Sequence, residues 1–302
     1  MPPAFRQNFD PGRRSPRATA RPTISGPASL TAVLYRIAAL FLVLAPALLL
    51  EPRAASSTDG PSLPEAGLTA LGTSAVAAVI DGDTLALEDG RELRLVGIQA
   101  PKLALGRPDF PTWPLAAEAR SALERLVQGQ VLALFAGGQQ TDRHGRMLAH
   151  LKRADGLWIQ GAMVQAGLAR AYSFPDNRAL ARELLALEAE ARAAGRGIWA
   201  DPFYRVRGPD ELADAIDSFQ LVEGRVVSAT KPKSRLYLNF GADWKTDFTV
   251  AIDAKALRLF AAAGLDPLAF QGRRLRVRGW VKSFNGPLID VTHPEQIEVL
   301  QE

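Results

Sequence analysis

The chain has 302 residues with ordinary hydrophobic (47%) and charged (23%) fractions, which excludes global disorder and leaves room for two domains. It contains no cysteine, which excludes disulfide bonds and thiolate metal sites. The net charge of +4 is uneven: residues 1–56 carry seven Arg and two acids (7 − 2 = +5), so residues 57–302 carry 4 − 5 = −1. Any anion site in the folded part therefore depends on local arginines, because long-range attraction for nucleic acid is weak.

The N-terminal residues have the pattern of a targeting segment. An apolar run of 14 residues, Ile37 to Leu50, follows Arg36 and precedes small residues at 54–56. This pattern is typical of a signal peptide, and the run is short for a membrane-spanning helix, which needs ~20 residues. We expect residues 1–56 to be a basic leader and the protein to be exported, periplasmic or extracellular. A membrane anchor formed by residues 30–50 is the alternative.

The next part of the chain alternates strands with helices. Residues 57–72 are rich in Pro, Gly and Ser and are expected to be a linker. Within residues 73–203, strands are expected at 74–80, 84–88, 91–98, 130–136, 147–152 and 157–160, and helices at 114–127, around 163–167 and at 178–194. Turn signals at Asp89-Gly90 and Asp155-Gly156 indicate two hairpins. Two hairpins, a further strand and interleaved helices predict a small closed barrel of the OB type.

The C-terminal part has a similar order of elements. Residues 204–218 are expected to be a second linker. Within residues 219–302, strands are expected at 221–229, 235–241, 246–252, 273–281, 288–291 and 296–300, and one helix at 255–263. This order fits a second, smaller OB-like β domain, so the fold class is mainly β with helices (α+β).

The run Ile80-Asp81-Gly82-Asp83-Thr84 places two carboxylates two residues apart. In an extended chain Asp81 and Asp83 point to the same face. Two carboxylates on one side can hold a hard cation such as Ca²⁺, which takes oxygen ligands. A plain Asp-Gly turn also explains the run, so taken alone it leaves both interpretations open.

Further motifs follow this run in a fixed order. They are Arg94 to Pro101, Thr141 to Arg146, Gly167 to Tyr172, and Gly197 to Trp199. The ordered series, over about residues 73–203, resembles the thermonuclease (micrococcal-nuclease-like, SNase-like) family. The resemblance implies an OB barrel and hydrolysis of DNA and RNA phosphodiesters with Ca²⁺.

The resemblance also implies roles for individual residues. Asp83 matches the metal-binding aspartate, Arg94 the arginine that grips the scissile phosphate, and Arg146 a second phosphate arginine. These roles are chemically consistent, because phosphodiester attack builds negative charge that a cation and two guanidinium groups neutralise. Arg143, in the same motif as Arg146, and Tyr172 are candidate substrate-binding residues. For Tyr172 core packing is the alternative.

Two positions depart from the family pattern. Gln99 stands where a second carboxylate holds the metal; its amide oxygen can bind Ca²⁺ but adds no negative charge. Lys102 replaces the acid that acts as a general base or orients the attacking water. A lysine is charged at neutral pH, so it has no lone pair for a proton and repels a cation. We therefore expect Asp81, Asp83 and Gln99 to bind Ca²⁺ weakly or not at all.

Two interpretations of the altered site remain open. In the first, Arg94, Arg146 and Lys102 form a cationic pocket that binds phosphate without efficient hydrolysis. In the second, the protein is still an active Ca²⁺-dependent nuclease because another acid, such as Asp109, Glu92 or Asp81, replaces the missing one.

The second barrel offers a separate candidate surface. Arg274, Arg276 and Arg278 alternate along one expected strand and are predicted to share a face, with substrate binding as their candidate role. Trp244, Tyr237, Phe240 and Trp280 are aromatic residues available for base stacking. A solvated strand face with ordinary core aromatics is the alternative.

The sequence therefore predicts a thermonuclease-family protein of the cell envelope that binds phosphodiesters or nucleic acid, with weakened or lost hydrolysis. The alternative of a Ca²⁺-dependent nuclease acting on DNA and RNA predicts cleavage that a chelator abolishes. A third possibility, a structural or protein-binding module of the envelope, predicts no nucleic-acid affinity at moderate salt. Nucleic acid is the expected partner, and membrane contact is expected only through the N-terminal apolar segment.

Overall fold

The computed structural model describes residues 60–243 and 245–301. The expected leader, with its signal peptide or anchor, lies outside these residues. Within the described ranges, none of the helices combines the length and the apolar character needed to cross a bilayer.

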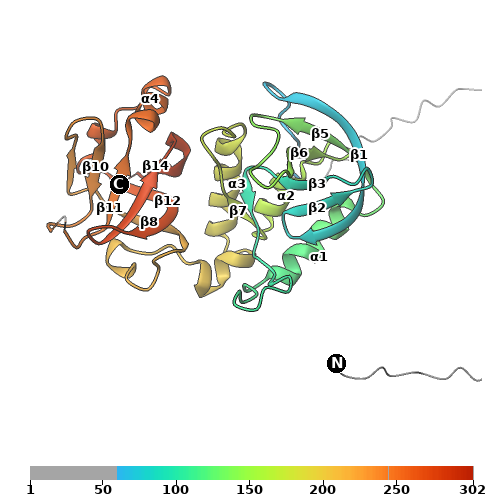
Figure 1. The fold of residues 1–302 in the computed structure, drawn as a ribbon, viewed down its shortest axis with the longest axis horizontal. Helices are drawn as coiled ribbons and strands as arrows, with labels where there is room; N and C mark the ends of the chain where they lie inside the picture. Colours follow the sequence, from blue (N-terminus) through green and yellow to red (C-terminus); the bar gives the residue numbers. More distant parts are fainter. Residues whose placement is uncertain (1–59, 244, 302) are drawn as a thin grey trace, which may run out of the picture. The chain divides into compact units, whose positions relative to one another are not determined.

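A closed barrel of five strands forms the first folded region (Figure 1). Its strands are β1 (Thr69–Asp81), β2 (Thr84–Leu87), β3 (Glu92–Leu95), β5 (Val131–Ala136) and β6 (Met147–Lys152). They are connected in the order β1-β2-β3-β6-β5, with β3 and β6 parallel and the other pairs antiparallel. This is the OB-type barrel that the sequence predicted. The first strand begins at Thr69, inside the stretch expected to be a linker, because Thr69 and Ala70 pair with the end of β5.

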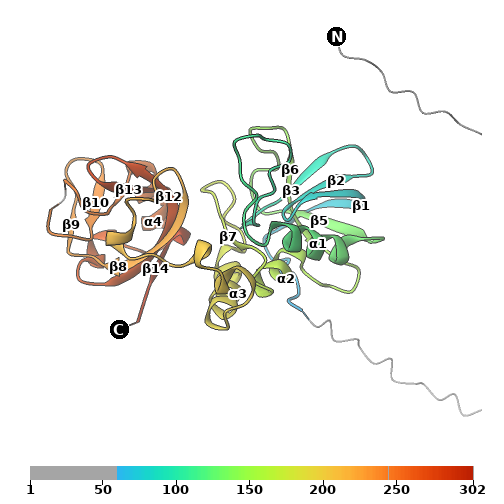
Figure 2. The same ribbon diagram turned by 90° about the horizontal axis from the view of Figure 1, so that it is seen from below.

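Three helices accompany this barrel. They are α1 (Ala116–Val127), α2 (Ile159–Gln165) and α3 (Ala181–Ala193). In Figure 2, α2 lies between α1 and α3. Helix α1 buries Ala119, Ala122, Leu123 and Val127 in the barrel core, at the three- and four-residue spacing of an amphipathic helix. A short pair, β4 (Ile98–Gln99) with β7 (Arg170–Ala171), connects the site loop to the segment before α3.

A strand was expected at 157–160, but only two isolated bridges form there, Leu157 with Ser62 and Trp158 with Lys152, and α2 begins at Ile159. The side chain of Gln160 explains the difference: it accepts a hydrogen bond from the Leu151 amide and donates one to the Ala149 carbonyl. The side chain of Gln160 thus satisfies two backbone hydrogen-bonding groups of β6, and a further strand is not needed to pair with them.

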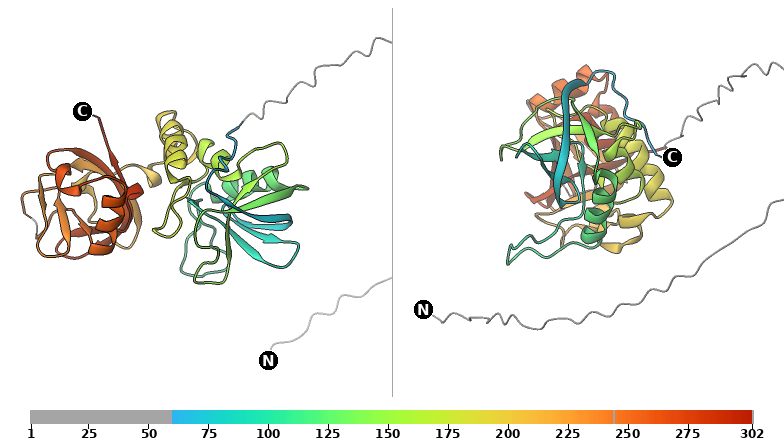
Figure 3. Two further views of the ribbon diagram at one scale, coloured as in Figure 1. Left: turned by 90° about the horizontal axis from the view of Figure 1, so that it is seen from above. Right: turned by 90° about the vertical axis from the view of Figure 1, so that its right-hand side faces the viewer.

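A curled sheet forms the second folded region (Figure 3). Its strands are β8 (Phe219–Arg225), β9 (Ser228–Thr230), β10 (Leu236–Asn239), β11 (Thr249–Ile252), β12 (Arg274–Ser283), β13 (Pro287–Val291) and β14 (Ile297–Val299), and α4 (Ala254–Ala262) follows β11. The order β9-β10-β11-β13-β12-β8, with β11 and β13 parallel, repeats the connectivity of the first barrel. Since β9 follows β8 after two residues, the sheet has the OB-like topology that the sequence predicted.

Each sheet encloses its own hydrophobic core. The first contains Leu85, Leu95 and Leu134, and the second contains Val250, Phe260 and Val277. The segment expected to be a linker at 204–218 is packed, because Leu212 and Ala215 are buried in the second core.

Buried ion pairs connect the two barrels. Arg278 on β12 donates to both carboxylate oxygens of Glu188 on α3, at 2.9 and 3.0 Å, and to Glu298 on β14 at 2.6 Å. Glu188 also accepts from the Ala171 amide at 2.7 Å. Burial opposes the charge of Arg278, but Glu188 and Glu298 outweigh it and raise the pKa of the guanidinium. The charges are thus fully compensated, as buried ions require.

Candidate functional site

The turn between β1 and β2 places Asp81 and Asp83 at one end of the first barrel. Thr84 pairs back with Asp81, and the Asp81 side chain accepts from the Gly82 amide at 2.8 Å. A side chain at Gly82 would lie 2.7 Å from the Ala100 side chain, so this close approach requires glycine. Both aspartates are buried and face the same side, as the sequence predicted.

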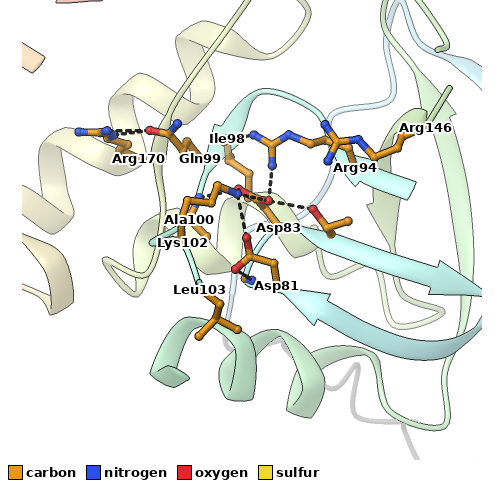
Figure 4. Close-up of polar contacts among 12 residues, drawn as sticks. Asp81, Asp83, Arg94, Ile98, Gln99, Ala100, Lys102, Leu103, Arg146 and Arg170 are labelled. Carbon is orange, nitrogen blue, oxygen red and sulfur yellow. Dashed lines mark hydrogen bonds and ion pairs between the residues drawn. The ribbon is translucent and has the colours of Figure 1, made fainter. Parts of the chain in front are cut away.

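The ammonium of Lys102 lies between these two carboxylates (Figure 4). Its Nζ is 2.6 and 2.7 Å from the two oxygens of Asp83 and 3.1 Å from Asp81 Oδ2. The positive charge of a lysine therefore occupies the place between two carboxylates where a bridging cation would bind.

Asp83 has further partners on its other sides. Its carboxylate forms an ion pair with Arg94, accepts from the Ala100 amide at 2.8 Å and accepts from the Thr84 hydroxyl at 3.1 Å. Burial raises the pKa of Asp83, but the charges and hydrogen bonds of Arg94 and Lys102 outweigh burial and hold that pKa well below its usual range. Asp83 is therefore an ionised group whose oxygens are already engaged.

Gln99 is turned away from the aspartates. Its Oε1 accepts from Arg170 Nε at 2.9 Å and Nη2 at 2.6 Å (Figure 4). Arg170 in turn donates to the Phe219 carbonyl of β8 at 3.3 Å. Burial lowers the pKa of Arg170 to about 10, so it remains a cation at neutral pH and needs this acceptor. The expectation that Gln99 offers its oxygen to a metal is therefore wrong.

The residues present do not fit the Ca²⁺ that the family resemblance implies. Ca²⁺ takes six to eight oxygen ligands, whereas the two aspartates already hold the ammonium of Lys102 and the oxygen of Gln99 is engaged by Arg170. Over residues 60–243 and 245–301, His, Asp and Glu side chains form no group of three or more that could hold a metal ion. The carboxylate oxygens of Asp81 and Asp83 are instead arranged to bind the side-chain ammonium of Lys102.

A cavity of about 980 Å³ opens above this cluster. Most of the predicted site residues line it together: Asp81, Arg94, Gln99, Lys102, Arg143, Arg146 and Tyr172. Among the acids proposed as replacements, Asp81 and Glu92 line the cavity, whereas Asp109 is exposed and is not among its lining residues.

Several arginines line the cavity. Arg146 is held by Asp142, with Nη2 at 2.7 Å from the carboxylate, and lies 3.8 Å from Glu92. In the described part of the chain, Arg107 and Arg143 form no ion pair with a carboxylate. Arg107 is instead fixed by hydrogen bonds to the carbonyls of residues 103 and 104. These two guanidinium groups are available for an anion.

Sequence reasoning gave no role to two of the residues that line the cavity, Arg107 and His144. Arg107 lies in the loop after Lys102, where a basic residue close to a predicted phosphate site was the available signal. His144 is adjacent to Arg143, whose Nε lies 3.1 Å from its Nε2. Of the aromatics expected to be available for stacking, Trp280 lines this cavity although it belongs to the second barrel, and Trp244 lies outside the described residues.

The structure corrects the predicted substrate-binding role of Arg274, Arg276 and Arg278. Arg274 and Arg276 pair with Glu223 at 2.6 and 2.8 Å. Arg278 is only 2% exposed and is bound by two glutamates, so it is inaccessible to a ligand. Neighbouring glutamates, which the alternation pattern ignored, convert this strand face into an ion-pair network.

The OB barrel carries buried carboxylates and several arginines at one cavity, and comparisons with known proteins match this region to a nuclease family. The family model described as staphylococcal nuclease homologue matches residues 92–201. A protein named uncharacterized endonuclease from Escherichia coli O157:H7 is 33% identical over 129 residues, which are 42% of this chain and 76% of the relative. A thermonuclease of Staphylococcus hyicus is 29% identical over 132 residues, 43% of this chain and 76% of the relative. The chain belongs to the staphylococcal nuclease homologue family, which confirms the prediction from the ordered motifs.

Proposed function

We propose that this protein binds nucleic-acid phosphodiesters without a metal ion and that its hydrolytic activity is weakened or lost. The observation that carries the proposal is the position of the Lys102 ammonium, 2.6 Å from Asp83 and 3.1 Å from Asp81. A covalently attached cation replaces a dissociable one, so positive charge is present at the site in the absence of Ca²⁺.

The same arrangement removes the base that would activate water. The Lys102 ammonium donates to two carboxylates, and an ammonium has no lone pair with which to accept a proton. Asp83 is a poor replacement, because the charges of Arg94 and Lys102 keep its pKa low. A general base typically contributes ~10²–10⁴-fold to the rate, so hydrolysis is expected to fall by at least that range.

Binding of the phosphate is assigned to the arginines around the cavity. Arg107 and Arg143 provide guanidinium groups without carboxylate partners among the described residues, and Arg146 is presented by Asp142. Guanidinium groups bind phosphate oxygens through paired hydrogen bonds. Because such contacts release counterions, affinity should fall steeply as salt rises.

The second candidate function is an active Ca²⁺-dependent nuclease. Its support is that Asp81 and Glu92 line the same cavity and could supply a missing acid. This function requires Lys102 to leave both aspartates so that a metal ion can enter.

Export from the cytoplasm is part of the proposal and is motivated by the apolar run Ile37 to Leu50. N-terminal sequencing of the mature protein tests it. A mature chain that begins near Ser56 supports cleavage of a leader, and a chain that retains the apolar run supports the anchor.

The activity is tested with the purified protein and single-stranded DNA and RNA, with Ca²⁺ or with a chelator. We expect salt-sensitive binding that is equal in both conditions and no cleavage in either. Cleavage that appears with Ca²⁺ and stops with the chelator would establish the nuclease and reject the proposal. Absence of binding at low salt would reject both functions.

A further inference from the structure

An aromatic wall forms one side of the cavity and uses both barrels. Tyr172 lies perpendicular to Phe174, with ring centroids 5.0 Å apart and an interplanar angle of 85°. The Tyr172 hydroxyl accepts a hydrogen bond from Trp280 Nε1 at 3.0 Å. Trp280 belongs to β12, outside the segment that matches the nuclease family.

The indole ring of Trp280 is partly exposed within this cavity. Its side chain is 46% exposed although it lines the same cavity as Arg94 and Arg146. The only polar atom of the indole is engaged by Tyr172, so the ring is held in a defined orientation while much of its surface contacts solvent. An oriented and exposed indole beside several arginines is the arrangement that single-stranded nucleic-acid sites use for base stacking.

The contacts between the barrels hold Trp280 in this position. Arg278, two residues earlier on the same strand, points to the same side and is buried against Glu188. Ser173, beside Tyr172, has its hydroxyl 2.8 Å from His293 Nε2 of the second barrel. Both Trp280 and Tyr172 therefore lie next to fixed connections, and their separation is set by the fold.

We propose that Trp280, supplied by the second barrel, stacks on a nucleobase of the strand whose phosphates the first barrel binds. The ligand class is single-stranded nucleic acid, because a base must be unpaired to present its face to an indole. The inference rests on the proposed phosphodiester binding and adds a role for the second barrel in it.

The test compares two probes of equal length and charge: an oligothymidylate and the corresponding abasic strand, which has sugar and phosphate without bases. The full-length protein is compared with Trp280→Ala and with Phe284→Ala. Phe284 is the matched control, since it is an aromatic of the second barrel that is 62% exposed and lies outside the cavity. We expect Trp280→Ala to weaken oligothymidylate binding by roughly tenfold and abasic binding not at all, and Phe284→Ala to change neither.

The outcomes separate this inference from the proposed function. If the unchanged protein binds neither probe, phosphodiester binding itself is rejected, and the stacking role with it. If the protein binds both probes and Trp280→Ala changes neither or weakens both equally, the stacking role alone is rejected.

Trp280→Phe provides a second readout if the alanine variant folds poorly. The difference in fluorescence between the unchanged protein and this variant reports the indole of Trp280. We expect oligothymidylate to quench this difference and the abasic strand to leave it unchanged. Equal quenching by the two probes, or none by either while binding is measured, contradicts stacking.

Discussion

Lys102 Nζ lies 2.6 and 2.7 Å from the two carboxylate oxygens of Asp83 and 3.1 Å from Asp81 Oδ2, so its ammonium occupies the space between two buried carboxylates. A glutamate at this position would add a third negative charge beside Asp81 and Asp83, whereas the lysine offsets their charge.

Lys102→Glu should therefore create dependence on Ca²⁺. Without metal, the clustered carboxylates repel one another and the melting temperature should fall. With Ca²⁺ in excess, binding to the folded state should restore it, since a ligand stabilises by about 2.7 kcal/mol at a hundred times its Kd. Thermal melts of the variant and the unchanged protein, with Ca²⁺ and with a chelator, check this. A Ca²⁺-induced rise of equal size in the unchanged protein would mean that Lys102 does not block the metal.

Gln99 should act as an acceptor for Arg170 and not as a metal ligand. Gln99→Leu removes the acceptor of a buried guanidinium, so we expect a loss of about 3 kcal/mol in the free energy of unfolding. Gln140→Leu, an exposed glutamine, should change stability by less than about 0.5 kcal/mol. Urea unfolding of the two variants measures the difference, and equal stability would place Arg170 in a different environment. For the same reason Gln99→Asp is expected to pair with Arg170 before it binds Ca²⁺.

The buried pair of Arg278 and Glu188 should show strong coupling. Arg278→Leu leaves Glu188 as an unpaired buried charge and should destabilise by about 3–5 kcal/mol. Arg278→Leu combined with Glu188→Leu should lose less than the sum of the single changes. Arg274→Leu, on the same strand but with 55% of its side chain exposed, should stay within about 0.5 kcal/mol of the unchanged protein. Additive losses in this double-mutant cycle would argue against a direct pair.

Stability should fall as pH drops from about 6.5 to about 4. Burial lowers the pKa of both His150 and His293 to about 4. The unfolded chain binds protons at these histidines below about pH 6.5 while the folded state does not, so acidification favours unfolding in this window. Each histidine should contribute about 2 kcal/mol of lost stability at pH 5.

Changing these histidines should flatten the pH dependence. The difference in unfolding free energy between pH 7 and pH 5 should shrink in His150→Gln and in His293→Gln. His144→Gln serves as the control, because His144 is exposed. An unchanged slope in both buried variants would show that other groups cause the acid sensitivity.

Much of the fold was predictable because local signals agree. The turn at Asp89-Gly90, the amphipathic pattern of α1 and the alternation in β12 are encoded in neighbouring residues. The missed features depend on distant partners. Gln160 bonds to β6 through its side chain, so the sequence gives no sign that a helix replaces a strand there.

The candidate site also contains some features that the sequence predicts and others that depend on distant partners. That Asp81, Asp83, Arg94, Lys102 and Arg146 would come together followed from the ordered family motifs, and the structure places them at or around one cavity. The orientation of Gln99 toward Arg170 depends on a contact within the first folded region, and the burial of Arg278 against Glu188 depends on a contact between the barrels. Arg170 is 71 positions from Gln99, and Arg278 is 90 positions from Glu188. A local strand pattern carries no information about partners at such separations.

The measurement that tests the central claim most directly is the affinity for a labelled single-stranded oligonucleotide with Ca²⁺ and with a chelator, for the unchanged protein and for Lys102→Met. The attached ammonium predicts equal affinity of the unchanged protein in both conditions and weaker binding by Lys102→Met in both. The account would be contradicted if the unchanged protein bound the oligonucleotide only with Ca²⁺. It would also be contradicted if Lys102→Met bound as tightly as the unchanged protein.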